Sequence, residues 1–353
     1  MAEAQRLNET RNPAPLLPWQ PHLRVVTDRA VERQDKTAAR LCDELGIHLW
    51  HAGDYTEAQP YLEKALAFHE KVSGTEHEDT AHSLNALGAL FNYIQDFQKA
   101  RPYLERALAI REKVLGAEHS DTATSLNDIG FLLDRQGDYE GARLYHERAL
   151  AIRQKVLGPE HPDTARSFSN LGGLLRDPKD FERARLYFER ALAINEKVLG
   201  LEHPDTASSL SRLGGILEDQ GNLGGARTYY ERSLAIFAKL LGSQHPFTAQ
   251  SLSNLGRLLQ EQKDYVGARS YYERALAIRE KVLGPEHPNT ARSLLNLGSL
   301  FFKQGNSARA RWYLERAMRA FSVHLGPNHP DTNEARRQLS MLPGGRRSKK
   351  RRS

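Results

Sequence analysis

Residues 148–152 read Arg-Ala-Leu-Ala-Ile, and this short string recurs through most of the chain. Its copies and close variants follow one another every 42 residues, with no insertion or deletion between them. They begin at Lys64, Arg106, Arg148, Arg190, Arg232, Arg274 and Arg316. A fixed period of this length is the signature of a repeat architecture, in which each copy folds into the same small unit.

Three other positions keep the same spacing. Tyrosine occupies one of them, at Tyr61, Tyr103, Tyr145, Tyr187, Tyr229, Tyr271 and Tyr313. Alanine occupies the second, at Ala58, Ala100, Ala142, Ala184, Ala226, Ala268 and Ala310. The third is an aliphatic residue followed by glycine, at Leu45, Leu87, Ile129, Leu171, Leu213, Leu255 and Leu297. Seven copies in register predict seven structural units.

Each unit reads as two helices joined by a short turn. In the copy at residues 121–156, apolar residues recur at helical spacing over 121–135 and again over 139–156. Between them, Gly137 permits a chain reversal and Asp138 can cap the next helix. After the second helix, Gly158 stops it and Pro162 suits the first turn of the following helix. Small residues such as Gly130 and Ala142 mark where two helix backbones approach closely.

One helical hairpin cannot bury its apolar sides alone, whereas stacked hairpins share a continuous core. We therefore predict an all-α protein, an α-solenoid wound as a right-handed superhelix of about seven hairpins. We expect residues 1–36 to form a disordered N-terminus and a degenerate capping helix, residues 37–330 the repeats, residues 331–342 a C-terminal capping helix, and residues 343–353 a disordered basic tail.

The net charge of +6 belongs to one end of the chain. Six of the 50 basic side chains lie in the last eight residues, which leaves 44 to balance 44 acidic ones. Any binding of nucleic acid or of an acidic membrane surface is therefore expected only through this tail. No apolar stretch is long enough to cross a bilayer, and no secretory signal is visible. A single cysteine favours a cytoplasmic setting.

We find no sign of an enzyme, a cofactor or a metal site. No phosphate-binding Gly-rich loop occurs, and Cys42 lies among apolar residues, as a buried thiol should. Histidine recurs at one linker position, at His77, His119, His161, His203, His245, His287 and His329. Equivalent residues of stacked hairpins are about 8–10 Å apart, too far to share one metal ion. We interpret these histidines as fixing the turn before each helix.

The order of Leu-Gly in the first helix, then Ala, Tyr and Ala-Leu in the second, resembles the tetratricopeptide repeat. The usual unit has 34 residues, and the longer unit of 42 is similar to the repeats of kinesin light chain. It is also similar to repeat arrays attached to bacterial signalling NTPases. The resemblance covers residues 37–342 and implies a non-catalytic scaffold or adaptor whose first helices line a concave groove.

The groove positions implied by this resemblance carry asparagine and arginine. An array of asparagines can hold an extended peptide by its backbone, and arginine recognises carboxylates. We therefore expect the groove to bind a protein or peptide segment, acidic or polar in character. The candidate partner-binding residues are Asn85, Asn127, Arg166, Asn170, Arg212, Asn254, Arg257, Arg292 and Asn296.

Two other functions stay open at this point. The array could serve as a sensor that works with a separate signalling NTPase or effector. It could also associate with nucleic acid through residues 346–352. The sequence identifies neither the partner nor the oligomeric state.

Overall fold

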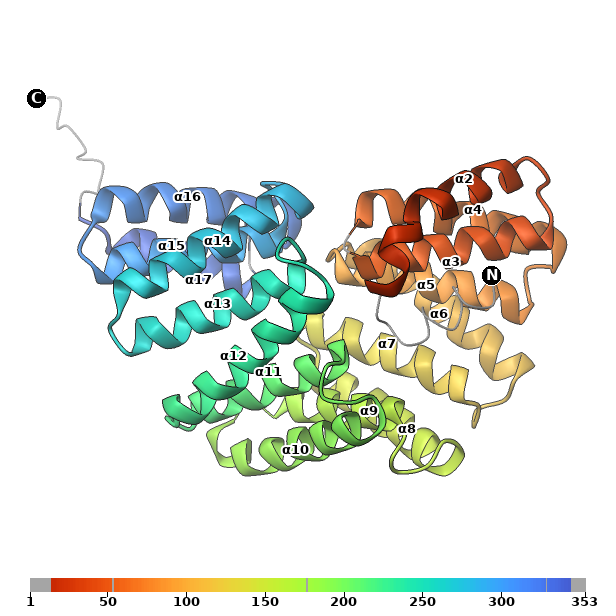
Figure 1. The fold of residues 1–353 in the computed structure, drawn as a ribbon, viewed down its shortest axis with the longest axis horizontal. Coiled ribbons are helices and arrows are strands. Elements are labelled where there is room, and N and C mark those ends of the chain that lie inside the picture. The colour runs from red at the N-terminus through yellow and green to blue at the C-terminus, as the bar shows by residue number, and fades with distance from the viewer. Residues whose placement is uncertain (1–13, 53, 176, 328, 344–353) are drawn as a thin grey trace, which may run out of the picture. The chain divides into compact units, whose positions relative to one another are not determined.

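The computed structural model describes residues 14–343, apart from residues 53, 176 and 328. The chain divides into two compact units, residues 1–245 and residues 246–353, which we describe separately. Within the described residues both units consist of helices and turns, without β-strands (Figure 1). The predicted all-α fold of stacked hairpins is confirmed. Disorder was expected for the N-terminus and for the basic tail, and nearly all of these residues lie outside the described ranges.

The first unit alternates first and second helices of successive hairpins, after a short N-terminal segment. Its helices are the 3-10 helix η1 (Ala14–Trp19), α2 (Gln20–Val31), α3 (Lys36–Ala52), α4 (Tyr55–Val72), α5 (Glu78–Tyr93), α6 (Phe97–Val114), α7 (Ser120–Gln136), α8 (Tyr139–Val156), α9 (Pro162–Leu174), the 3-10 helix η2 (Pro178–Asp180), α10 (Phe181–Val198), α11 (Pro204–Asp219) and α12 (Leu223–Leu240). The second helix predicted for residues 139–156 has these bounds as α8.

The second unit continues the same alternation. It contains α13 (Pro246–Glu261), α14 (Tyr265–Leu283), α15 (Pro288–Lys303), α16 (Ser307–His324) and α17 (Pro330–Met341). Helix α17 packs on α16 and buries Thr332 and Ala335, while arginines such as Arg336 are exposed. In the first unit, α2 packs on α3 in the corresponding way. We retain the proposal that α2 and α17 cap the array.

The linker histidines hold the turn before each first helix, as interpreted from the sequence. In α7, the Nδ1 atom of His119 accepts a hydrogen bond from the backbone N–H of Asp121 at 3.2 Å. The same bond, accepted by the histidine, occurs at five other linkers, at His77, His161, His203, His287 and His329. The ring of His245 instead donates from Nε2 to the carbonyl oxygen of His51, 2.9 Å away. Among the described residues no cluster of ligands suited to a metal ion occurs.

Close contact between the two helices of a hairpin depends on glycine. A Cβ atom on Gly88 would lie 2.6 Å from the side chain of Leu104, and one on Gly130 would lie 2.8 Å from the ring of His146. Ala142 has no exposed surface. The close approach predicted at Gly130 and Ala142 is therefore confirmed. Cys42 is also fully buried, which raises the pKa of its thiol to about 12.

Three junctions between neighbouring hairpins contain a buried polar bridge that the repeat pattern did not predict. A guanidinium from one second helix donates to a serine of the next first helix. Arg153 in α8 has no exposed surface, and its Nη1 atom donates to Ser167 Oγ at 2.8 Å and to the backbone oxygen of Asp163 at 3.2 Å. Arg111 and Arg279 make the same bond to Ser125 and Ser293. We call this contact the arginine–serine bridge.

Candidate functional site

A cavity of about 260 Å³ lies within the first unit, on the side formed by its first helices. It collects residues from α3, α5, α7, α9 and α11, with one residue from α10. We call it the groove cavity. Its lining residues are Trp50, Ala89, Asn92, Tyr93, Asn127, Asp128, Phe131, Pro162, Arg166, Ser169, Asn170, Asn195, Asp205, Ser208, Ser209 and Arg212.

Four residues predicted from the sequence lie together in this cavity: Asn127, Arg166, Asn170 and Arg212. The amide of Asn170 donates to Asn127 Oδ1 at 2.8 Å, so the two side chains form one step of a ladder between neighbouring hairpins. Asn127 is only 4% exposed. These asparagines therefore spend part of their hydrogen-bonding capacity on each other.

Asn85 lies behind the groove cavity rather than in its wall. It is 7% exposed, its amide donates to Asp128 Oδ2 at 2.7 Å, and its oxygen accepts from the hydroxyl of Ser125 at 2.8 Å. Asp128 lines the cavity. Asn85 thus positions a carboxylate that faces the cavity.

The two arginines of the cavity differ in their partners. Arg166 forms an ion pair with Asp163, with Nη2 and Oδ1 3.1 Å apart. Arg212 forms no hydrogen bond or ion pair with any residue that the structure describes. Its guanidinium lies among the walls of the groove, close to Gly173, and this desolvation lowers its pKa, although the side chain stays accessible to solvent. Arginine remains charged under such a shift. Arg212 is therefore a cation available to an anionic ligand group.

Three buried polar atoms at the cavity have no hydrogen-bond partner among the residues that the structure describes. They are the donor Nε of Arg166 and the acceptors Oδ1 of Asn92 and of Asn195. Asn92 is 1% exposed and Asn195 is 4% exposed. A buried polar atom without a partner costs about 1–3 kcal/mol. A ligand that brings one acceptor and two donors would remove this cost.

The cavity arises where the arginine–serine bridge is replaced. Asn195 occupies the repeat position of Arg111, Arg153 and Arg279. Its shorter amide still donates to Ser209 Oγ, at 3.0 Å, but its Oδ1 atom is left without a partner. Asn92 and Asn195 were not predicted as site residues. The repeat position of Asn195 varies along the chain, with arginine in only three copies, so neither Asn195 nor Asn92 carried a clear sequence signal.

The other four predicted residues lie in the second unit. Asn254 accepts a hydrogen bond from the side chain of Gln250 at 3.0 Å. Arg292 pairs with Asp331 and lies over the ring of Phe321, so its charge is satisfied within the unit. Arg257 is exposed and Asn296 is half-buried.

A protein-family model described as "Tetratricopeptide repeat" matches residues 37–113, 92–155, 121–197, 205–281 and 253–322. No curated protein sequence matches the chain. Within the described part of the chain, every helix is too short or too polar to cross a lipid bilayer.

Several solved structures are similar to the chain. BtubC from P. vanneervenii is 24% identical, with a TM-score of 0.49 over 68% of this chain and 94% of that one. A putative kinesin light chain of Podosopora anserina with nearly identical repeats is 27% identical, with a TM-score of 0.45 over 58% and 98%. The Rap conjugation gene regulator of the plasmid pLS20, in complex with the Phr* peptide, is 18% identical, with a TM-score of 0.65 over 82% and 77%. The last likeness concerns the fold alone.

Proposed function

The chain belongs to the tetratricopeptide repeat family, and on that premise we propose that its groove cavity binds an extended polar segment of a protein partner. Solenoid proteins present extended concave surfaces for binding, and this chain is a protein-interaction scaffold in that general sense. The finer proposal concerns residues 14–245 alone, where the cavity lies.

The observation that carries the proposal is the set of partnerless buried atoms at Asn92, Arg166 and Asn195. A peptide group offers one C=O acceptor and one N–H donor, which suit the Nε donor of Arg166 and an asparagine Oδ1 acceptor. A second peptide N–H would satisfy the remaining acceptor. A peptide backbone therefore has the chemistry that the cavity lacks.

Charge favours a segment that carries one carboxylate. Of the two arginines of the cavity, Arg212 is the one without a hydrogen bond or ion pair to a described residue, and charge-assisted bonds to arginine are the stronger class of hydrogen bond. Asp128 and Asp205 also line the cavity, so a run of acidic residues would be repelled. We thus refine the expected acidic partner to a polar segment with a single acidic side chain opposite Arg212.

Aromatic residues supply an apolar end to the cavity. Trp50, Tyr93 and Phe131 are among its lining residues. Such side chains contribute a large contact area when an apolar side chain packs against them. We propose that the segment places one apolar side chain here.

One similar structure agrees with this ligand class, although the proposal does not depend on it. The Rap regulator of similar fold was solved with a bound peptide.

The buried thiol of Cys42 suits a reducing compartment, and we propose a cytoplasmic location. The roles of a sensor for a signalling NTPase and of nucleic-acid binding through residues 346–352 gain no observation from the described residues.

The test is selection of peptides from a phage-displayed random library on the full chain, followed by anisotropy measurements with a synthetic peptide. We expect Arg212→Gln to weaken binding about tenfold or more, because a charge-assisted bond is lost. Changing the acidic residue of the peptide to its amide should produce the same loss, and the two losses should not add.

The control is Arg227→Gln, which removes an exposed arginine on the second helix α12 and should leave the affinity unchanged. Failure of the library to yield any saturable binder contradicts the proposal. So does a peptide whose affinity is the same for the wild type and for Arg212→Gln.

A further inference from the structure

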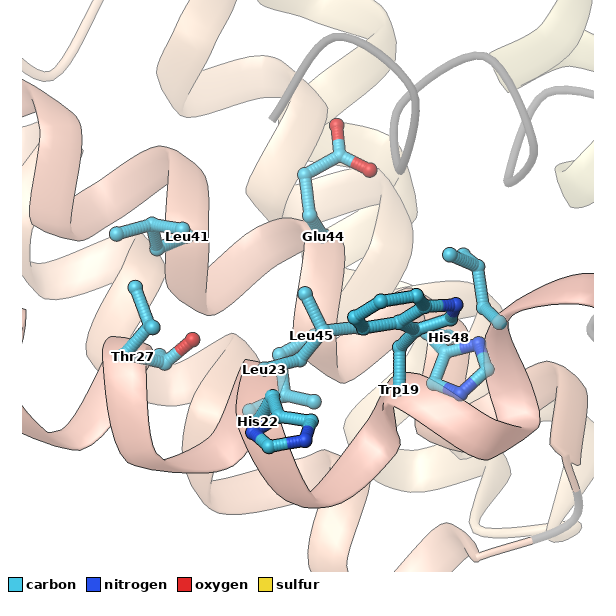
Figure 2. Close-up of a pocket in the computed structure, with 10 residues that line it drawn as sticks. Trp19, His22, Leu23, Thr27, Leu41, Glu44, Leu45 and His48 are labelled. Carbon is cyan, nitrogen blue, oxygen red and sulfur yellow. The ribbon is translucent and has the colours of Figure 1, made fainter.

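A second cavity, independent of the groove, lies where the N-terminal helix α2 covers the first hairpin. It measures about 220 Å³ and is enclosed by η1, α2 and α3. We call it the cap cavity. Figure 2 shows Leu23 and Leu45 in its middle, with Thr27 and Leu41 toward one end and Trp19 and His48 toward the other.

The cap cavity departs from the repeat pattern at three positions. Helix α2 is in register with the second helices and α3 is a first helix, so residues 27 and 41 occupy the two positions that form the arginine–serine bridge at three other junctions. Thr27 stands at the arginine position and Leu41 at the serine position, so no bridge can form. In the six hairpins that follow, the serine position holds Ser83, Ser125, Ser167, Ser209, Ser251 and Ser293, and in α17 it holds Ala335.

The third departure is a histidine in place of an aliphatic core residue. His48 lies at the repeat position that is otherwise leucine or isoleucine. The other copies are Leu90, Leu132, Leu174, Ile216, Leu258 and Leu300. Six copies out of seven show that the hairpin packs well with an aliphatic side chain here. His48 is therefore not required by the repeat fold.

Two polar side chains of this cavity, His48 and Thr27, are buried and have no hydrogen-bond partner among the described residues. His48 has no exposed surface and neither Nδ1 nor Nε2 makes a hydrogen bond. Thr27 is 1% exposed and its Oγ1 atom is likewise without a partner. By contrast the buried ring of His69, in the second helix of the same hairpin, contacts Asp43 with Nε2 and Oδ2 3.1 Å apart. His69 Nδ1 and His146 Nδ1 are also without a hydrogen-bond partner, but at His48 neither ring nitrogen is paired within the described residues.

Burial also sets the protonation state of His48. Desolvation lowers the pKa of its imidazole to about 4, so the ring is neutral at pH 7. A neutral imidazole offers one N–H donor and one acceptor, and the hydroxyl of Thr27 offers both. The only carboxylate among the lining residues is that of Glu44, which would repel an anion.

We propose that the cap cavity binds a small neutral molecule with an apolar ring and one N–H or hydroxyl group, which hydrogen-bonds to His48 or Thr27. The wall that receives the ring is formed by Leu16, Leu23 and Leu45. Size agrees with this class, because a dry apolar cavity of about 150 Å³ holds benzene. A cavity of about 220 Å³ accommodates a two-ring molecule of the size of indole.

The test is isothermal titration calorimetry of the full chain with indole and with indene, which has the same shape but lacks the N–H group. Indole should bind with one-to-one stoichiometry, and indene about tenfold more weakly, because one buried hydrogen bond is lost. Indole-3-carboxylate should not bind. Failure of indole to bind saturably up to its solubility, or equal affinities for indole and indene, overturns the proposal.

Two variants distinguish binding in the cap cavity from general effects of a substitution on the fold. His48→Leu copies the residue at Leu90 and should fold, but it should weaken indole binding about tenfold while leaving indene unaffected. The matched control is His146→Leu, which copies Leu104 at another buried histidine and should leave the affinity for indole unchanged. Indole affinity that is equal in His48→Leu and the wild type contradicts the assignment. Neither variant changes a residue of the groove cavity, so this outcome is distinct from that of the peptide experiment.

Discussion

The junction between α8 and α9 and the junction between α10 and α11 are built on the same repeat pattern with one different residue. At the first, the arginine–serine bridge of Arg153 fills the interface. At the second, Asn195 reaches Ser209 but leaves a partnerless oxygen beside the groove cavity. The comparison indicates that the regular junction contributes stability, whereas the irregular one borders the cavity for which we propose a ligand.

The size of the residue that replaces the bridge arginine decides whether a cavity opens at the junction. Phe321 replaces the arginine at the last junction and is fully buried against α17, where Ala335 replaces the serine. His69 also replaces it, and its Nε2 atom is paired with Asp43. Thr27 and Asn195 are shorter, and each borders a cavity with unsatisfied polar atoms. A short polar residue at this position therefore marks a candidate site.

The largest effect is expected at the regular junction. Arg153→Ala removes three hydrogen-bonded contacts, to Ser167, Asp163 and Thr124, and leaves a void. We expect a loss of about 3 kcal/mol, against about 1 kcal/mol for Asn195→Ala, whose partners are fewer. Urea unfolding followed by circular dichroism measures both. Equal losses in the two variants would break the comparison.

A smaller effect is expected on acidification of the same region. Burial lowers the pKa of His146 in α8 to about 4, with Arg153 and Arg212 adding to the shift. Because the unfolded chain then binds the proton more tightly, stability falls as pH decreases from about 6.5 toward 4. Lowering the pH from 7 to 5 should cost about 2 kcal/mol through this residue.

His146→Leu isolates this contribution. The variant should lose less thermal stability between pH 7 and pH 5 than the wild type does, as measured by circular dichroism melting curves. An identical loss in both proteins would show that His146 does not carry the sensitivity.

The smallest effect is expected at an exposed ion pair between α8 and the linker that precedes α7. Lys155 pairs with Glu118 at 2.6 Å, and both side chains are largely exposed. Exposed pairs contribute little, so Lys155→Ala should change the free energy of unfolding by less than about 1 kcal/mol. A larger loss in the same urea experiment would mean that surface pairs, and not the buried bridge, join the hairpins.

The helices could be predicted because spacing alone determines which residues a hairpin buries. Tyr139–Val156 is a helix as expected, since glycine and proline mark its limits. The candidate site was predicted only in part. Asn127 and Arg212 were found from the face on which they lie, but the partnerless state of Asn92 depends on distances between separate hairpins. Such distances are not encoded in periodicity.

The most direct test of the account restores the regular junction at the groove cavity. The double variant Arg166→Thr with Asn195→Arg copies Thr124 and Arg153, and it should fill the cavity with the chain's own guanidinium. Anisotropy with the library-selected peptide measures the result. We predict a folded protein whose affinity for that peptide falls about a hundredfold, which corresponds to about 3 kcal/mol. A well-folded double variant that binds the peptide as tightly as the wild type would contradict the claim.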